Sequence, residues 1–343
     1  MLHPARLWKQ LKNNKVQCRL CNHFCVIKPD DHGICGVRQN VDGSLFTKTY
    51  DLVAAINIDP VEKKPLYHFL PGSETFSLGT QGCNFGCEFC QNASLSQHPK
   101  SGRAVTGQKA TPETLVEAAL AHNCRSISYT YSEPTIFFEL MQDTAKLAHE
   151  KGLKNIMVSN GFQSPECLEE LAPLIDAANI DLKSFNNNFY KDICKGSLNP
   201  VLETLKHIKR LGWWLEVTTL LIPGKNDDMF EIKQMAKFIA NELGEEVPWH
   251  ISRFHPDYMM QDIAVTPMKA LALARKAGTD AGLNYVYVGN VPGSESSATF
   301  CPSCKKEIIS RFGFSMENKG VENGMCKYCG TQANGVFEKD ELK

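Results

Sequence analysis

The chain has 343 residues, of which 43% are hydrophobic and 22% charged, and its formal net charge at pH 7 is −1. This composition is ordinary for a soluble globular protein, and the balanced charge provides no basic surface of the kind that binds nucleic acid. No apolar run approaches the length of a membrane span, and residues 1–12 lack a following apolar stretch, so we expect a cytoplasmic protein without a signal peptide.

The fourteen cysteines are the most informative part of the composition. Eleven of them form three compact groups, and the other three (Cys124, Cys167 and Cys194) are scattered. Grouped thiols at short spacing, in a chain without a secretion signal, indicate metal ligation in a reducing compartment. We expect three parts: an N-terminal cysteine-rich segment (1–72), a core (73–293) and a C-terminal module (294–343).

The first group has the spacing Cys-x2-Cys-x3-Cys-x9-Cys and comprises Cys18, Cys21, Cys25 and Cys35. Four thiolates can close a tetrahedral zinc site or hold an auxiliary iron–sulfur cluster. Residue types leave both interpretations open, together with thiols packed without metal. The segment has little apolar content, so a metal would help to hold it together. Residues 45–58 favour one or two strands.

The second group, Cys83-x3-Cys87-x2-Cys90, follows directly on a short apolar strand at 75–79. Soft sulfur ligands on one loop suit an iron–sulfur cluster. Three ligands are one short of the four that a four-iron cluster takes, which leaves one iron with an open position. The alternatives are a zinc loop or a set of structural thiols.

This loop, with Phe89 just before its last cysteine, resembles the cluster loop of radical S-adenosylmethionine (SAM) enzymes. The resemblance implies a [4Fe-4S] cluster whose open iron binds the amino and carboxylate groups of SAM. One electron from the reduced cluster then cleaves SAM, and the resulting 5′-deoxyadenosyl radical abstracts hydrogen from a substrate. The protein supplies binding, orientation and exclusion of water.

The core alternates short apolar strands with amphipathic helices, which predicts a parallel α/β sheet. We expect the strands at 75–79, 126–131, 155–159, 178–182, 214–221, 249–254 and 285–288. A cap residue followed by proline predicts four helix starts, at Thr111, Ser164, Asn199 and Thr266. Glycines predict four helix ends, at Gly152, Gly212, Gly244 and Gly278. The predicted fold is a partial (β/α)6-type radical SAM barrel, with chemistry on the loops at the strand carboxyl ends.

Residues after the predicted strands are candidates to bind SAM. Tyr131-Ser132-Glu133-Pro134 stands in place of the superfamily's Gly-Gly-Glu-Pro stretch, so the resemblance assigns Ser132 and Glu133 to the SAM ammonium. A carboxylate facing an ammonium gains a charge-assisted hydrogen bond. The alternative is a helix cap.

Further along, Ser159-Asn160-Gly161 and Asp181-Leu182-Lys183 resemble two stretches of glycyl-radical activating enzymes. The resemblance implies that Ser159 and Asn160 contact the methionine portion or ribose of SAM, and that Lys183 reaches its carboxylate. It also places His255, at the end of the sixth strand, near SAM. In isolation each tripeptide is more typical of a turn or a surface charge than of a site, and for His250 a core or surface histidine is nearly as typical.

Together, several stretches resemble one family, the AmmeMemoRadiSam system radical SAM enzymes, similar to pyruvate formate-lyase activating enzyme. They are the N-terminal cysteines, residues 62–72, the Pro-Trp-His strand at 248–250, and residues 285–293. The resemblance covers nearly the whole chain. It implies Memo-like and other system proteins as partners, and an electron donor such as ferredoxin or flavodoxin.

The third group forms two Cys-x2-Cys knuckles, Cys301/Cys304 and Cys326/Cys329, separated by 21 residues. This pattern predicts a zinc-ribbon-like module, and four thiolates close the coordination shell, so the site should be structural. A mononuclear iron would have the same sulfur geometry.

The sequence therefore predicts a radical SAM enzyme whose substrate no motif identifies. One alternative is a glycyl-radical enzyme activating enzyme acting on a partner protein. Another is a non-catalytic zinc-binding interaction module. RNA modification is favoured by the ribbon and disfavoured by the near-neutral charge.

Overall fold

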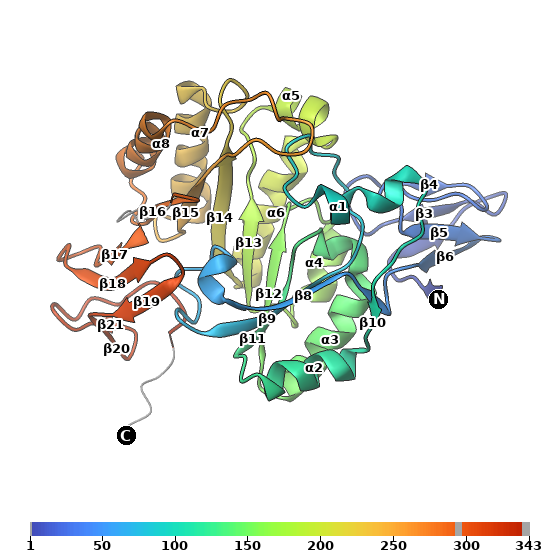
Figure 1. The fold of residues 1–343 in the computed structure, drawn as a ribbon, viewed down its shortest axis with the longest axis horizontal. Helices are drawn as coiled ribbons and strands as arrows, with labels where there is room; N and C mark the ends of the chain where they lie inside the picture. The colour runs from blue at the N-terminus through green and yellow to red at the C-terminus, as the bar shows by residue number, and fades with distance from the viewer. Residues whose placement is uncertain (1, 292–296, 338–343) are drawn as a thin grey trace.

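An eight-stranded sheet forms the centre of the protein in the computed structural model, which describes residues 2–291 and 297–337 (Figure 1). Seven strands are parallel and adjacent in chain order: β9 (Glu74–Gly79), β11 (Ser126–Tyr129), β12 (Lys154–Ser159), β13 (Ala177–Asp181), β14 (Trp214–Leu221), β15 (Trp249–Arg253) and β16 (Val286–Gly289). The eighth, β8 (Ala55–Pro60), pairs antiparallel with β9 at one edge. The predicted parallel α/β architecture is confirmed, with every expected strand present.

Helices connect the parallel strands, because a parallel pair needs a long crossover. The main ones are α2 (Pro112–Ala121), α3 (Phe138–Glu150), α4 (Pro165–Leu171), α6 (Leu198–Leu211), α7 (Met229–Phe238) and α8 (Met268–Asp280). Shorter turns are η1 (Val61–Lys63), α1 (Ala93–Ser96), η2 (His98–Ser101), η3 (Pro134–Phe137), α5 (Asn187–Phe189), η4 (Tyr190–Cys194) and η5 (Ile239–Leu243). None of the helices within residues 2–291 and 297–337 combines the length and apolar character needed to cross a membrane.

Two of the four predicted helix starts are confirmed and two are wrong. Thr111 and Ser164 cap α2 and α4, each accepting a hydrogen bond from the backbone N–H three residues on. Helix α6 begins earlier than predicted, after Ser197, so Asn199 is not its cap. Helix α8 begins after Pro267, because the Thr266 hydroxyl is used elsewhere: it accepts from the Phe254 N–H and donates to the Leu221 carbonyl.

Gly278 does not end a helix, contrary to the prediction. It lies inside α8, where an added Cβ would come within 2.8 Å of a Val286 methyl and 3.0 Å of the Trp249 ring. The glycine therefore permits close packing of α8 on the sheet. Gly152 and Gly212 do stand at helix ends, both with positive φ, and Gly244 ends η5.

The N-terminal segment forms small antiparallel sheets beside the core. They comprise β1 (His3–Pro4) with β6 (Ser44–Thr47) and β5 (Arg38–Val41), β2 (Trp8–Gln10) with β3 (Val16–Cys18) and β4 (Val26–Ile27), and β7 (Leu52–Val53) with β10 (Gln108–Lys109). A buried ion pair fastens the segment to α3, with 2.7 Å between Arg38 Nη2 and Glu139 Oε1. Residues 45–58 thus contribute to three strands rather than one or two.

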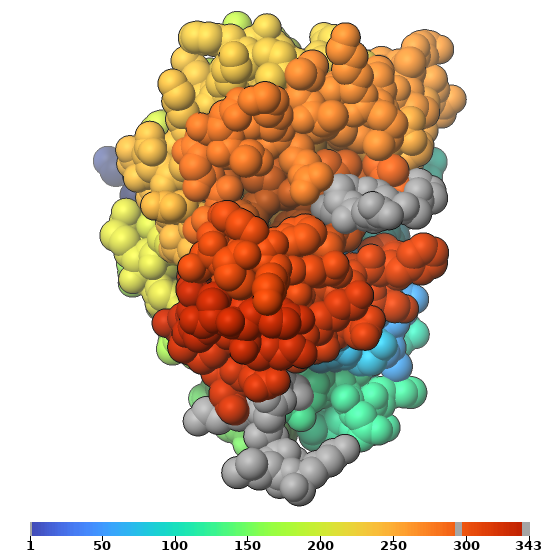
Figure 2. Space-filling model, turned by 90° about the vertical axis from the view of Figure 1, so that its left-hand side faces the viewer, coloured from blue at the N-terminus to red at the C-terminus, as the bar shows by residue number. Residues whose placement is uncertain are grey.

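The C-terminal module packs against the barrel on the side shown in Figure 2, directly below the part of the chain that carries α8. Its strands are β17 (Thr299–Phe300), β18 (Glu307–Phe312), β19 (Ser315–Asn318), β20 (Val321–Glu322) and β21 (Met325–Cys326). Arg311 extends from β18 into the barrel, where its guanidinium lies 4.3 Å from the centre of the Tyr67 ring. The expected boundary between the core and the C-terminal module, at 293/294, lies outside the described residues. The end of the 285–293 stretch lies outside them as well.

Candidate functional site

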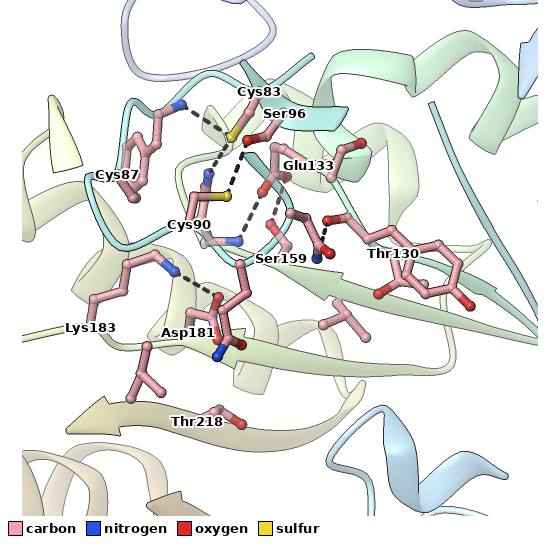
Figure 3. Close-up of a pocket in the computed structure, with 18 of the residues that line it drawn as sticks. Cys83, Cys87, Cys90, Ser96, Thr130, Glu133, Ser159, Asp181, Lys183 and Thr218 are labelled. Carbon is pink, nitrogen blue, oxygen red and sulfur yellow. Dashed lines mark hydrogen bonds and ion pairs between the residues drawn. The ribbon is translucent and has the colours of Figure 1, made fainter. Parts of the chain in front are cut away.

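A cavity of about 370 Å³ lies at the carboxyl ends of the parallel strands. Its walls come from the loop after β9, from the residues following β11, β12 and β13, and from side chains of β14 and β15 (Figure 3). Cys83, Cys87 and Cys90 all line it. This is the end of a parallel sheet at which α/β proteins bind their ligands.

The backbone of the loop after β9 brings the three cysteines to one wall. Gly82 has φ +112, and an added Cβ would lie only 2.8 Å from a Val37 methyl, so the turn requires glycine. The Phe85 N–H points at Cys83 Sγ at 3.3 Å, and the Ser96 hydroxyl lies 3.1 Å from Cys90 Sγ. The thiols are therefore held in place before any ligand binds.

Burial raises the pKa of the Cys83 and Cys90 thiols above the ordinary value. The pKa of the Cys87 thiol is also raised, mainly by its hydrogen bond to Cys194 and in second place by burial. Such thiols stay neutral on their own, whereas iron deprotonates a coordinating thiol outright. Three thiols on one cavity wall, with Cys87 buried and Cys83 and Cys90 half-buried, thus fit a cluster whose iron atoms supply positive charge.

Cys194 is a neighbour of the site that its isolated position in the sequence did not reveal. It is fully buried at the end of η4, and its carbonyl accepts a hydrogen bond from the Gly86 N–H at 2.8 Å. Cys194 is not among the residues that line the cavity. The thiols that the loop places on the cavity wall are those of Cys83, Cys87 and Cys90.

Glu133 joins the ends of two neighbouring strands. It caps η3, as the alternative interpretation held, and it also lines the cavity. Its carboxylate accepts hydrogen bonds from the Thr135 N–H and hydroxyl, from the Ser159 hydroxyl at 2.8 Å and from the Asn160 N–H at 2.9 Å. Burial raises the pKa of Glu133, and these donors oppose the shift. The neighbouring Ser132 hydroxyl lines the cavity and is buried, and within residues 2–291 and 297–337 it has no hydrogen-bond partner.

Asn160 connects this pair of strands to the cysteine loop. Its Nδ2 donates to Asn84 Oδ1 at 2.7 Å and lies 3.8 Å from Cys83 Sγ. Predicted residues from three separate stretches (the cysteine loop, Glu133, and Ser159 with Asn160) thus form one continuous hydrogen-bonded wall.

Lys183 and Asp181 form an ion pair on the opposite wall, with 2.7 Å between Nζ and Oδ2 (Figure 3). Lys183 Nζ also lies 5.7 Å from the centre of the Phe89 ring. Burial works against the charge of Lys183, but Asp181 and the nearby Cys87 and Cys194 outweigh it and raise the pKa of the lysine. A cation is therefore fixed at the cavity wall.

His255 is exposed and is not among the residues that line the cavity. His250 is buried below it and pairs with Glu216 at 2.6 Å. The strand β15 contributes Ser252 to the wall instead, and β14 contributes Thr218, whose hydroxyl is buried with no hydrogen-bond partner in the part of the chain that the structure describes. Sequence reasoning did not identify Ser252 or Thr218, because neither belongs to a recognisable motif.

The part of the cavity lined by Lys63, Lys64 and Tyr131 carries a second ionic network. Asp59 accepts hydrogen bonds from Lys63 Nζ at 2.8 Å, from Lys64 Nζ at 2.6 Å and from the Tyr131 hydroxyl at 2.6 Å. Burial opposes the charge of Asp59, but these donors outweigh it and hold its pKa well below the ordinary range. Tyr131 has φ +67, a conformation that costs about 1–2 kcal/mol without glycine, at a position where the superfamily pattern has glycine.

The sequence model of the radical SAM superfamily matches residues 77–238, the stretch that carries the cysteine loop and the Glu133–Ser159–Asn160 wall. The chain belongs to the radical SAM superfamily. Members of this superfamily are enzymes, including activases and methyltransferases, and their fold implies a [4Fe-4S] cluster and SAM.

Two relatives and one solved structure are similar to the chain. It is 44% identical over 338 residues to an uncharacterised protein of Methanocaldococcus jannaschii, covering 98% of this chain and all of that one. It is 27% identical over 186 residues (53% of this chain, 68% of that one) to a protein of the same organism that is provisionally named a glycyl-radical enzyme activating enzyme. A radical SAM methyltransferase from Sphaerobacter thermophilus shares the fold, with a TM-score of 0.50 and 14% identity over 84% of this chain and 76% of that one.

The radical SAM chain has two further cysteine groups, and their spacing differs. Cys301, Cys304, Cys326 and Cys329 have their sulfur atoms within 4.8 Å of one another, close enough to share one metal ion. Among the described residues, no other set of three or more such ligand atoms is as compact. Neither the cluster-loop thiols nor the four N-terminal thiols include three sulfur atoms that all lie within that distance of one another.

Proposed function

We propose that the protein is a radical SAM enzyme in which Cys83, Cys87 and Cys90 hold a [4Fe-4S] cluster with one iron open to SAM. The strongest support comes from what lines one cavity. Cys83, Cys87 and Cys90 contribute their thiols to it, beside a wall of polar side chains and the fixed cation of Lys183. With cluster and SAM bound, one-electron cleavage of SAM supplies a 5′-deoxyadenosyl radical that abstracts hydrogen from the substrate.

We assign roles to the wall residues from their chemistry. Glu133 would face the SAM ammonium, and Lys183, oriented by Asp181, would pair with the SAM carboxylate. Ser132 and Thr218 have buried hydroxyls without partners, which are available to the polar groups of SAM. Ser159 and Asn160 hold Glu133 and the cysteine loop in register. We do not include His255, because it lies outside the cavity wall.

The second candidate is a glycyl-radical enzyme activating enzyme. It is supported by the relative of that provisional name and by the benzylsuccinate synthase activating enzyme of Thauera aromatica, which is 20% identical over 160 residues. The cavity, of about 370 Å³, is at the small end of the range for ligand sites. A large substrate would therefore place only its reacting carbon inside, past Lys63 and Lys64. A peptide loop of a partner protein could reach it in this way.

We extend the proposal to the surroundings of the enzyme on the motif resemblance. We infer that it is a cytoplasmic AmmeMemoRadiSam enzyme with a Memo-like protein among its partners and a ferredoxin or flavodoxin as electron donor. We also propose that the four C-terminal thiols bind a structural zinc ion, since a closed four-thiolate shell leaves no position for substrate.

The test is the reductive cleavage of SAM under anaerobic conditions. We expect the reduced wild type to form 5′-deoxyadenosine, and Cys83→Ala, Cys87→Ala and Cys90→Ala each to abolish it. Cys124→Ala is the matched control, since Cys124 is buried but does not line the cavity, and it should retain activity. Formation of 5′-deoxyadenosine by any of the three loop variants would refute the proposal. A glycyl radical on an added partner protein, detected by EPR, would show that the protein acts as a glycyl-radical enzyme activating enzyme, the second candidate function.

A further inference from the structure

We propose that Cys18, Cys21, Cys25 and Cys35 hold a second iron–sulfur cluster, a redox centre beside the cluster loop, rather than a zinc ion. This metal assignment does not depend on the reaction proposed above. It depends on the spacing of the four thiols, on a buried arginine next to them, and on their position between the surface and the cluster loop.

The four thiols gather around the β3–β4 hairpin and the turn that follows it. Cys18 and Cys25 face each other across the hairpin, where the Cys18 N–H donates to the Cys25 carbonyl at 3.0 Å. Gly33 lies between Cys25 and Cys35: an added Cβ would be 3.8 Å from both sulfur atoms. Cys18 and Cys35 are buried, and Cys21 and Cys25 are half-buried. A side chain at this position would therefore contact both sulfur atoms.

The spacing of these sulfurs differs from that of a single-ion site in the same protein. The C-terminal thiols show what a one-ion site looks like here, with Cys301 and Cys329 Sγ 3.6 Å apart and Cys304 and Cys326 Sγ 3.8 Å apart. No three of the N-terminal thiols lie within 4.8 Å of one another, and the same holds for the cluster-loop thiols. Four thiolates around a wider space suit an iron–sulfur cluster, which is larger than one ion.

Arg38 supplies the charge that an anionic cluster needs. Its side chain is 1% exposed, and it lies close enough to Cys18, Cys21 and Cys35 for its charge to act on all three. Its Nη2 donates to Glu139 and to the Arg6 carbonyl, but its Nε and Nη1 are buried and have no hydrogen-bond partner among the described residues. Buried donors of this kind are rarely left unsatisfied. A cluster bearing four thiolates offers them sulfur acceptors and a negative charge.

The group lies directly beside the cluster loop. The backbone of Cys35 packs on Gly82, with its carbonyl oxygen 3.3 Å from the position of an added Cβ. His23, between Cys21 and Cys25, has its Nε2 2.8 Å from the carbonyl oxygen of Asn84. On the other side the neighbouring residues Val26 and Ile34 are 56% and 52% exposed. A cluster here would therefore lie between solvent and the loop that holds Cys83.

The test separates the two clusters by removing one set of ligands at a time. In anaerobically purified protein, the triple variant C83A/C87A/C90A should keep about four irons and four sulfides per chain. On reduction it should give an EPR signal that SAM does not alter, because four protein thiolates leave no open iron. Adding C21A and C25A should remove that iron and signal, while the zinc equivalent of the C-terminal thiols stays and reports an intact fold.

Wild-type protein provides a second measurement that needs no variant. Its reduced EPR spectrum should contain two signals, of which SAM shifts one. A triple variant that retains no iron, together with a wild type that shows a single signal, would overturn the proposal. So would the loss of a second zinc equivalent, instead of iron, on adding C21A and C25A. Absence of 5′-deoxyadenosine from wild type would refute the proposed reaction but leave this metal assignment intact.

Discussion

Glu216 provides the sharpest prediction about what holds the barrel together. It lies on β14 below the cavity, is completely buried, and accepts four hydrogen bonds: from the Tyr67 N–H at 3.0 Å, the His68 N–H at 2.8 Å, Trp214 Nε1 at 3.0 Å and His250 Nε2 at 2.6 Å. Burial opposes its ionisation, but the His250 partner and the other donors outweigh burial and lower the pKa of Glu216 from its ordinary 4.5. The carboxylate therefore joins β14 and β15 to the segment before β9.

The substitution Glu216→Gln keeps the shape and replaces one carboxylate oxygen with an NH2 group. If the NH2 faces His68 and Trp214, two donors lose their acceptor. If it faces Tyr67 and His250, the imidazole can change tautomer and accept, so one donor is left unmatched. Each unsatisfied buried group costs about 1–3 kcal/mol, so we expect a loss of about 3 kcal/mol. At roughly 2 °C per kcal/mol for a chain of this size, the melting temperature should fall by about 6 °C.

Thermal unfolding followed by circular dichroism measures this loss. Glu203→Gln is the control, since Glu203 is 56% exposed and pairs with Lys206 along α6, and its effect should stay within about 0.5 kcal/mol. Because the pKa of Glu216 is lowered on folding, its contribution is present above pH 4.5 and is lost as the pH falls below that value. The difference between wild type and Glu216→Gln should therefore narrow in acid. A fall in melting temperature no larger than that of Glu203→Gln would refute the reasoning.

Three further predictions concern the site and the metals. Lys183→Met should raise the KM for SAM about tenfold or more, because a charged hydrogen bond is lost. The control Lys276→Met, at an exposed lysine of α8, should leave the KM for SAM within twofold of wild type, and equal KM values in the two variants would exclude the assigned contact. Cys329→Ser should remove the zinc equivalent measured by metal analysis without lowering the iron content, and retained zinc would argue against the C-terminal site. Cys194→Ser should keep its full complement of cluster iron, because Cys194 does not line the cavity; loss of iron would identify Cys194 as a fourth ligand.

Local patterns were sufficient to predict the sheet and the cysteine groups. A fully buried parallel strand is a short apolar run, and β12 or β14 can be recognised from the sequence without knowing its neighbours. The spacing of Cys83, Cys87 and Cys90 is also local. The errors arose where a side chain had a distant partner, as for Thr266, which bonds across to Leu221 and Phe254, and for Gly278, which packs on Trp249.

The walls of the cavity were predictable only in part, for the same reason. Side chains alternate along a strand, and β15 directs His250 and Ser252 into the barrel, where they meet Glu216 and the cavity. His255 lies beyond the end of that strand and out of phase with both, which a tripeptide resemblance does not register. In the network of Asp59, Lys64 and Tyr131, the tyrosine is far in sequence from the other two residues, and only the fold brings it to them.

The open iron is the central claim, and electron–nuclear double resonance of the reduced protein tests it most directly. SAM labelled with magnetic isotopes at its amino nitrogen and carboxylate oxygens should show hyperfine coupling of both labels to the cluster in the wild type and in Cys124→Ala. If the cluster of the Cys83 loop is present and reduced but shows no such coupling, the assignment of Cys83, Cys87 and Cys90 as its only protein ligands is contradicted.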